Sequence, residues 1–148
     1  MVRKLMAALA ILAVGISAAA AQSCDDVVKT RQSLMKRSGE MGKVGASMVK
    51  GETPFDLAKV KEIFAAFAED ATSMPTLFPD CSKTVASSNA APAIWENLDD
   101  FKKLTEKFAA DVKQAQENTK DLDSLKASFA AIGKDCGGCH ERFRIKKS

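Results

Sequence analysis

The stretch Cys136-Gly137-Gly138-Cys139-His140, close to the C-terminus of a 148-residue chain, governs how the rest of the sequence is interpreted. It has the form C-x-x-C-H, by which haem c is attached: each thiol forms a thioether with a vinyl group of the porphyrin, and the histidine binds the iron. Cysteines three residues apart on a helix lie on neighbouring faces, so both reach one edge of a flat macrocycle. The motif therefore predicts covalent haem attachment through Cys136 and Cys139, with His140 as the proximal iron ligand.

Three other interpretations compete with haem attachment. A thioredoxin-like redox pair would follow a strand in a cytosolic βαβ unit, and no strand pattern precedes the motif. A zinc site would need further ligands nearby, and His140 is the only histidine in the chain. A structural disulfide between Cys136 and Cys139 would leave that histidine without a role. Haem attachment is the interpretation that uses all three residues.

The N-terminus has the pattern of a secretory signal peptide. Arg3 and Lys4 precede an apolar stretch from Leu5 to Ile16, and alanines at 19–21 offer a small-residue cleavage site. The apolar stretch is too short to span a membrane, so we expect no stable membrane insertion after cleavage. The sequence thus predicts a signal peptide over residues 1–21 and one exported, periplasmic domain over residues 22–148.

Export also bears on the other two cysteines, Cys24 and Cys81. An oxidising compartment permits disulfides, and an even pair of cysteines in an exported chain usually forms one. We therefore predict a Cys24–Cys81 disulfide, for which the chain-entropy account gives at most roughly 4 kcal/mol of stabilisation. Two unrelated thiols are the alternative, and lipidation of Cys24 is disfavoured because Gln22 and Ser23 precede it.

Apolar residues recur at helical spacing in four segments, and no segment has a convincing strand pattern. The helical segments run from Asp25 to the turn at 50–54, from about Phe55 to Ser73, from Pro92 to Thr119, and from about Ser124 through the haem motif. Helices joined by short, long and short connections predict an all-α, antiparallel up-and-down four-helix bundle. In such a bundle the first helix begins beside the end of the second, which brings Cys24 close to Cys81.

The second axial position of the iron has several candidate ligands. A second histidine is excluded, so the sixth ligand is a methionine, another weak donor or nothing. The methionines that remain after signal cleavage are Met35, Met41, Met48 and Met74. A methionine in an apolar stripe is more often core packing than a ligand. Met35 is nevertheless favoured, because it lies midway along the first helix, against which a haem carried by the last helix must lie.

Several runs of sequence together resemble a known family. They are the C-x-x-C-H near the C-terminus, KTRQSLMK at 29–36, KGETPFD at 50–56 and PAIW at 92–95. In combination they resemble the class II c-type cytochromes, the cytochrome c′ family, over essentially the whole mature chain. Cytochromes c′ are themselves standard examples of the four-helix bundle, so the agreement with the predicted fold is not independent.

The resemblance implies roles for three further residues. The family divides at one position of the first helix: a bulky apolar residue there leaves the iron five-coordinate and high-spin, and a methionine makes it six-coordinate and low-spin. Counted from Arg31, which matches an arginine near the haem propionates, Met35 occupies this position. The resemblance thus implies the methionine-ligated, low-spin branch. Arg144 matches a basic residue that the family keeps against the proximal histidine. The other cysteine pair is not part of the family pattern.

These observations predict a periplasmic one-electron carrier with a single covalently attached haem c. A low-spin iron with both axial positions filled rearranges little when it gains or loses an electron, and a thioether ligand favours the ferrous state. The main alternative is a five-coordinate protein that binds nitric oxide or carbon monoxide, which requires that Met35 does not ligate the iron or leaves it easily. An enzyme such as a peroxidase is disfavoured, because no distal histidine is available as acid or base.

The basic residues around the haem motif have two interpretations. Five basic residues lie around the haem motif: Lys134, Arg142, Arg144, Lys146 and Lys147. They would steer an acidic redox partner protein, or they would only complement the dipole at the end of the last helix. The near balance of basic and acidic residues gives no indication of nucleic-acid binding. Relatives often dimerise through their first two helices, so the resemblance leaves a homodimer open.

Overall fold

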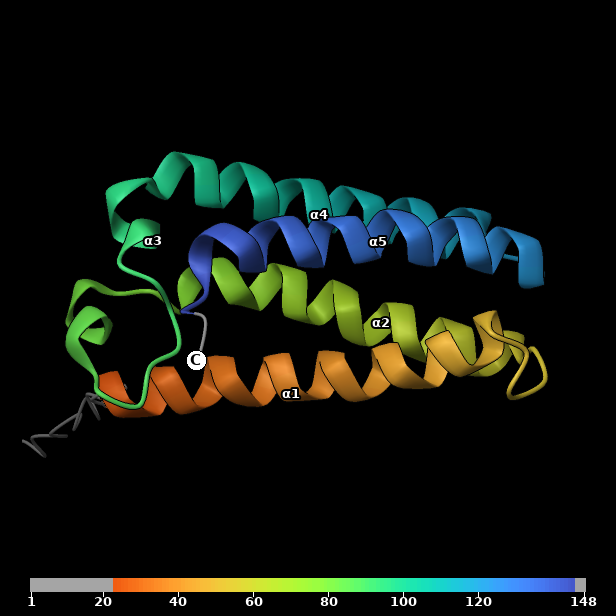
Figure 1. The fold of residues 1–148 in the computed structure, drawn as a ribbon, viewed down its shortest axis with the longest axis horizontal. Helices are drawn as coiled ribbons and strands as arrows, with labels where there is room; N and C mark the ends of the chain where they lie inside the picture. The colour runs from red at the N-terminus through yellow and green to blue at the C-terminus, as the bar shows by residue number, and fades with distance from the viewer. Residues whose placement is uncertain (1–22, 146–148) are drawn as a thin grey trace, which may run out of the picture.

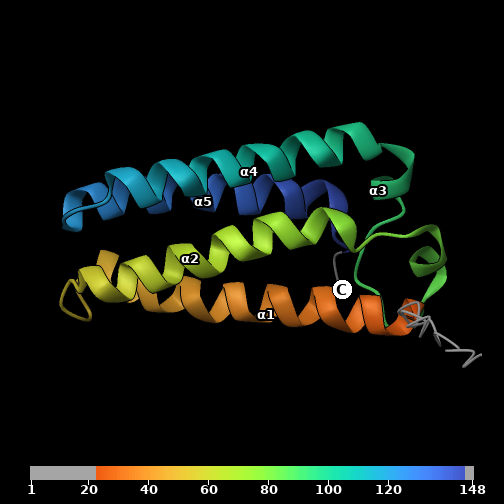
Figure 2. The ribbon, with the colours of Figure 1, turned by 180° about the vertical axis from the view of Figure 1, so that it is seen from behind.

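The computed structural model describes residues 23–145, so the signal peptide predicted for residues 1–21 lies outside the described residues. The elements are α1 (Cys24–Val49), α2 (Leu57–Ser73), the 3-10 helices η1 (Met74–Thr76) and η2 (Asp80–Thr84), α3 (Ala93–Glu96), α4 (Leu98–Asn118) and α5 (Leu122–Phe143). The long helices α1, α2, α4 and α5 lie side by side and alternate in direction (Figures 1 and 2). The predicted all-α, up-and-down four-helix bundle is confirmed.

Polar side chains fix where three of the long helices begin. Ser23 caps α1, and Asp56 caps α2 by accepting two backbone N–H groups. Asp121 and Ser124 form a capping box at the start of α5, in which each side chain bonds the backbone of the other residue. This capping box starts α5 at Leu122, two residues before the start expected near Ser124.

The third predicted helix is interrupted, so the prediction of one continuous helix from Pro92 to Thr119 is wrong. Asn97 has φ −135° and ψ 51°, which is not helical, and it separates α3 from α4. Its backbone N–H and its side-chain Nδ2 both donate to the carbonyl of Ala93, over 3.0 and 3.2 Å. The apolar spacing continues across this residue, which is why periodicity does not reveal the break.

Buried apolar side chains form two separate clusters. The larger cluster draws on α1, α2, α4 and α5 and contains Met48, Val60, Ile63, Phe64, Phe67, Val112, Ala115, Leu125 and Ile132. The smaller cluster lies where α3 meets α4 and α5, and it contains Ile94, Phe101 and Phe143, with Phe78, Trp95 and Cys139 among the residues packed against it. A domain of this size usually has one contiguous core, so a divided core calls for an explanation.

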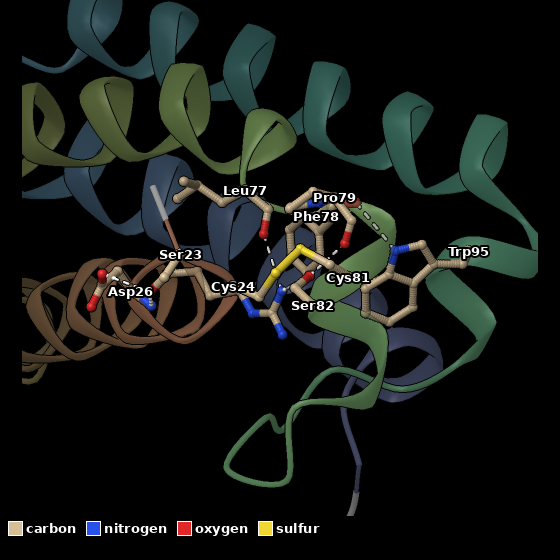
Figure 3. The surroundings of a disulfide bond; sticks show 10 residues. Ser23, Cys24, Asp26, Leu77, Phe78, Pro79, Cys81, Ser82 and Trp95 are labelled. Atoms are coloured by element: carbon tan, nitrogen blue, oxygen red, sulfur yellow. Dashed lines mark hydrogen bonds between the residues drawn. A yellow bond between two sulfur atoms is a disulfide. The ribbon is translucent and has the colours of Figure 1, made fainter. Parts of the chain in front are cut away.

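A disulfide joins the start of α1 to the segment after α2. Cys24 at the start of α1 and Cys81 in η2 form a disulfide with a Cα–Cα distance of 5.8 Å (Figure 3), which confirms the predicted pairing.

None of the helices in residues 23–145 has both the length and the apolar character that a membrane span needs.

Helices α1 and α5 approach closely at Gly45. A Cβ atom built on this glycine would lie 1.9 Å from the ring of Phe129, so only glycine allows the ring to pack there. Gly42, one turn earlier, has only an ordinary contact of 4.0 Å with Phe67.

The two glycines provide a matched test of this packing. We expect Gly45→Ala to lower the free energy of unfolding by about 1–2 kcal/mol, because the ring of Phe129 must move. Gly42→Ala is expected to raise it by up to about 1 kcal/mol, because alanine favours the helix and its Cβ meets only an ordinary contact with Phe67. Urea unfolding of the haem-loaded protein, followed by circular dichroism, measures both values. If both substitutions changed the free energy of unfolding in the same direction, the packing of Phe129 on Gly45 would be contradicted.

Candidate haem site

The C-x-x-C-H motif lies in the last two turns of α5, between the two apolar clusters. Ile132, one turn before Cys136, belongs to the larger cluster, and Phe143, one turn after Cys139, belongs to the smaller one. Cys139 itself packs against the smaller cluster. The motif therefore occupies the level of the bundle at which the core is divided.

Both cysteines of the motif are free thiols, and they are the only ones among the described residues. Burial raises the pKa of each thiol, and the neighbouring charge of Asp135 raises that of Cys136 further. The residue Cys136 as a whole is exposed, yet the atoms around its sulfur are enough to desolvate the thiolate. Redox-active cysteine pairs have lowered pKa values, so these thiols do not fit a thioredoxin-like site.

The zinc interpretation finds no support in residues 23–145, where no group of three or more histidine, cysteine, aspartate or glutamate side chains is placed to hold a metal ion. The disulfide interpretation is also unsupported, because Cys136 and Cys139 are not joined.

His140 is half-buried, and burial lowers the pKa of its imidazole. The positive charge of Arg144 lowers that pKa further. Arg144 stands at the C-cap of α5, where its backbone N–H donates to the carbonyl of His140 over 3.3 Å. Both effects favour the neutral imidazole, which is the form that binds a metal ion.

Met35 differs from the other three candidate methionines. Met48 and Met74 are buried, and Met41 packs against the larger cluster, so these three are accounted for by core packing. Met35 lies on α1 with 40% of its surface exposed and belongs to neither cluster. An apolar side chain without a place in the core is free to serve as a ligand.

The residues present fit a haem c. A divided core offers apolar surface above and below the motif, as a flat apolar macrocycle requires. Two free thiols one turn apart match its two vinyl groups, and a neutral imidazole follows them in sequence. The donor set therefore supports attachment at Cys136 and Cys139 with His140 on the iron.

Arg31 is placed differently from the expectation that the family resemblance gave. It is 5% exposed, and its guanidinium points into the segment between α2 and α3. Nη1 donates to the carbonyl of Leu77 and to Oγ of Ser82, each over 3.0 Å, and Nη2 donates to Oγ of Ser88 over 2.5 Å. The guanidinium also lies 4.7 Å from the centre of the Phe78 ring. Pairing with a haem propionate stays a prediction; holding this segment is a role that the sequence did not reveal.

A polar cluster beside the motif was also missed. Asp135, directly before Cys136, is 8% exposed and forms an ion pair with Lys107 of α4. Lys107 also donates to Asp111 over 2.8 Å and holds the pKa of that carboxyl down. Burial raises the pKa of Asp135 in spite of the attraction of Lys107. One ammonium group is thus shared by two carboxyl groups next to the haem attachment site.

Removal of this ammonium group should destabilise the bundle in a pH-dependent way. We expect Lys107→Met to lower the free energy of unfolding by about 2 kcal/mol at pH 7, less than for a fully buried pair because Lys107 is half exposed. The loss should be smaller at about pH 4.5. Because burial raises the pKa of Asp135, this carboxyl binds a proton in the folded state at that pH, and a neutral carboxyl no longer needs the ammonium group of Lys107.

Urea unfolding of the haem-loaded protein at both pH values measures the effect. Lys103→Met is the matched control: Lys103 pairs with Asp100 at the surface over 3.9 Å, so its loss should leave the free energy of unfolding nearly unchanged. An equal loss for Lys107→Met at both pH values would contradict the assignment of a buried Asp135.

A four-helix bundle with a C-x-x-C-H motif in its last helix, between the halves of a divided core, is the architecture of a c-type haem protein. The family model described as cytochrome C′ matches residues 26–144. The chain therefore belongs to the cytochrome c′ family, and the resemblance found in the sequence is confirmed.

Individual relatives cover nearly the whole chain. Cytochrome c′ from Rhodopseudomonas palustris is 43% identical over 123 residues, which are 83% of this chain and 84% of that protein. Cytochrome c-556 from Agrobacterium fabrum is 38% identical over 149 residues, which are 99% of this chain and 100% of that protein. The solved structure of cytochrome c′ from Rhodopseudomonas palustris superposes with a TM-score of 0.80 at 43% identity, covering 83% of this chain and 98% of that one.

Proposed function

We propose that this protein is a periplasmic one-electron carrier whose haem c is bound through Cys136 and Cys139 and ligated by His140 and Met35. The observation that carries the axial assignment is the position of Met35. It is the one candidate methionine that is exposed and lies outside both apolar clusters, and it lies on α1, which packs against the haem-bearing helix α5 at Gly45. The similarity to a cytochrome c-556 over the whole chain supports the same branch of the family.

The residues around the iron position suit electron transfer. The haem, when bound, supplies an iron that alternates between the ferric and ferrous states. Burial of His140 and the charge of Arg144 keep the proximal imidazole neutral and ready to coordinate. Met35 supplies a soft thioether that favours the ferrous state and raises the reduction potential. With both axial positions filled by the chain itself, little rearranges around the iron during electron transfer.

Exposed cations around the motif suit an acidic redox partner. Lys134 and Arg144 are exposed and form no ion pair with another described residue, whereas Arg142 is paired with Asp100 over 2.9 Å. Charges that are not neutralised within the chain accelerate encounters with a partner of opposite charge. Dimerisation through α1 and α2 stays a prediction.

A second function is favoured by one observation, the exposure of Met35. The residue is 40% exposed and lies outside both apolar clusters, so core packing does not fix the position of its sulfur. If the sulfur does not bind the iron, the open position accepts nitric oxide or carbon monoxide, and the protein is a gas-binding member of the family.

Optical spectra of the purified protein distinguish the two functions. We expect a low-spin spectrum with a methionine-to-ferric charge-transfer band and no rapid reaction of the ferrous form with carbon monoxide. In Met35→Leu the band should disappear, and carbon monoxide should bind at once. Met41→Leu, which changes a methionine packed against the larger cluster, is the control and should leave the spectrum unchanged. A high-spin spectrum of the parent protein would favour the gas-binding function.

A further inference from the structure

The segment between η1 and α3 is tied to the first half of α1 by covalent and polar bonds. We call residues 77–91 the strut. Its Cys81 forms the disulfide with Cys24, and Arg31 donates to Leu77, Ser82 and Ser88. Figure 3 shows the disulfide at the start of α1, with Leu77 and Ser82 of the strut beside it. One residue after Arg31, Nε2 of Gln32 donates to the carbonyl of Ser87 over 2.7 Å.

The other end of the strut is tied to the chain directly after the haem motif. The backbone N–H of Ala91 donates to the carbonyl of Phe143 over 2.9 Å, and the N–H of Ile145 donates to the carbonyl of Asn89 over 2.9 Å. Ala90 and Arg144 form an isolated antiparallel bridge. These partners lie three to five residues after His140, so the strut connects α1 with the C-terminal end of α5.

Ser88 links the two ends of the strut. Its Oγ accepts a hydrogen bond from Nη2 of Arg31 over 2.5 Å and one from the backbone N–H of Ala90 over 3.1 Å. Ala90 is the residue bridged to Arg144. A short path of bonds therefore runs from Arg31, four residues before Met35, to Arg144, four residues after His140.

Apolar packing does not provide the same connection. The smaller apolar cluster, to which Phe143 belongs, contains no residue of α1. Val27 and Val28 of α1 are buried but belong to neither cluster. At the opposite end of the bundle α1 and α5 touch directly, through Gly45 and Phe129.

The anchors of α1 lie on both sides of Met35. On one side are the bonds of Arg31 and Gln32 to the strut. On the other side, Arg37 pairs with the buried Asp70 of α2, and Oγ of Ser38 donates to the same carboxylate over 2.5 Å. The position of the Met35 backbone is thus set by polar anchors, while its side chain belongs to neither apolar cluster.

We propose that the strut is a positioning element for Met35. It fixes the separation of α1 from α5 at the level of the haem, and so holds the Met35 sulfur against the iron that His140 ligates. This inference rests on the proposed function. A thioether is a weak ligand, so a small outward movement of α1 shifts the population towards an open sixth position. The strut thereby determines whether the chain acts as a closed electron carrier or as an open, gas-binding protein.

The test weakens the strut and measures how often the sixth position is open. The first variant is Ser88→Ala, which removes the link between Arg31 and Ala90. The second measurement uses the folded parent protein, in which a phosphine reduces the Cys24–Cys81 disulfide and leaves the thioether bonds to the haem intact. Val112→Ala is the control, because Val112 is fully buried in the larger cluster, away from the strut. Carbon monoxide is the probe of the ferrous protein.

We expect carbon monoxide to bind about tenfold faster to the Ser88→Ala variant and to the disulfide-reduced protein, because the binding rate follows the fraction of protein with an open iron. The methionine-to-ferric charge-transfer band should weaken in Ser88→Ala. Val112→Ala should change neither property.

Two results would overturn the inference while leaving the proposed function intact. One is a low-spin parent protein whose rate of carbon monoxide binding is the same after both changes to the strut. The other is an equal acceleration in Val112→Ala, which would show that any loosening of the bundle releases Met35. A high-spin parent protein would overturn the proposed function, and the inference with it.

Discussion

The structure depends on a constraint at one level of the bundle: α1 and α5 must be held at a fixed separation where no apolar cluster joins them. At the opposite end, Phe129 packs onto Gly45, and the larger cluster binds all four long helices together. Near the haem motif, the smaller cluster lacks residues of α1. There the disulfide, the hydrogen bonds of Arg31 and the ion pair of Arg37 with Asp70 hold α1 in place. The haem motif thus lies at the level of the bundle where covalent and polar bonds, rather than an apolar cluster, hold α1 in place.

The sequence predicts the features that arise from local spacing. The C-x-x-C-H motif indicates the attachment site by itself, and the helical recurrence of apolar residues indicates four helices. The disulfide between Cys24 and Cys81 follows from the up-and-down order of those helices, since that order brings the start of α1 beside the end of α2. The break at Asn97 was not predictable from periodicity, because a single non-helical residue does not disturb the apolar pattern.

The polar anchors could not be predicted, because their partners are distant in the sequence and ordinary in type. Arg31 bonds a backbone carbonyl and serines 46 to 57 residues away, which no spacing rule connects. Asp135 lies 28 residues from Lys107, on another helix. From the sequence alone it resembles any surface carboxylate, because its burial arises only from the packing of α5 against α4. The family resemblance led to Arg31 as a site residue, and Met35 was indicated both by its place on the first helix and by the resemblance. The structure adds that Arg31 holds the strut and that Met35 lies outside both apolar clusters.

The central claim is that Met35 ligates the iron opposite His140. The most direct measurement is a proton NMR spectrum of the ferrous, haem-loaded protein in which the methionine methyl groups carry ¹³C. The ring current of the haem shifts the methyl group of an axial methionine far upfield of all the others. The account predicts one such upfield methyl signal, and its loss in Met35→Leu. A spectrum without an upfield methyl signal, or one in which the signal survives the substitution, would contradict it.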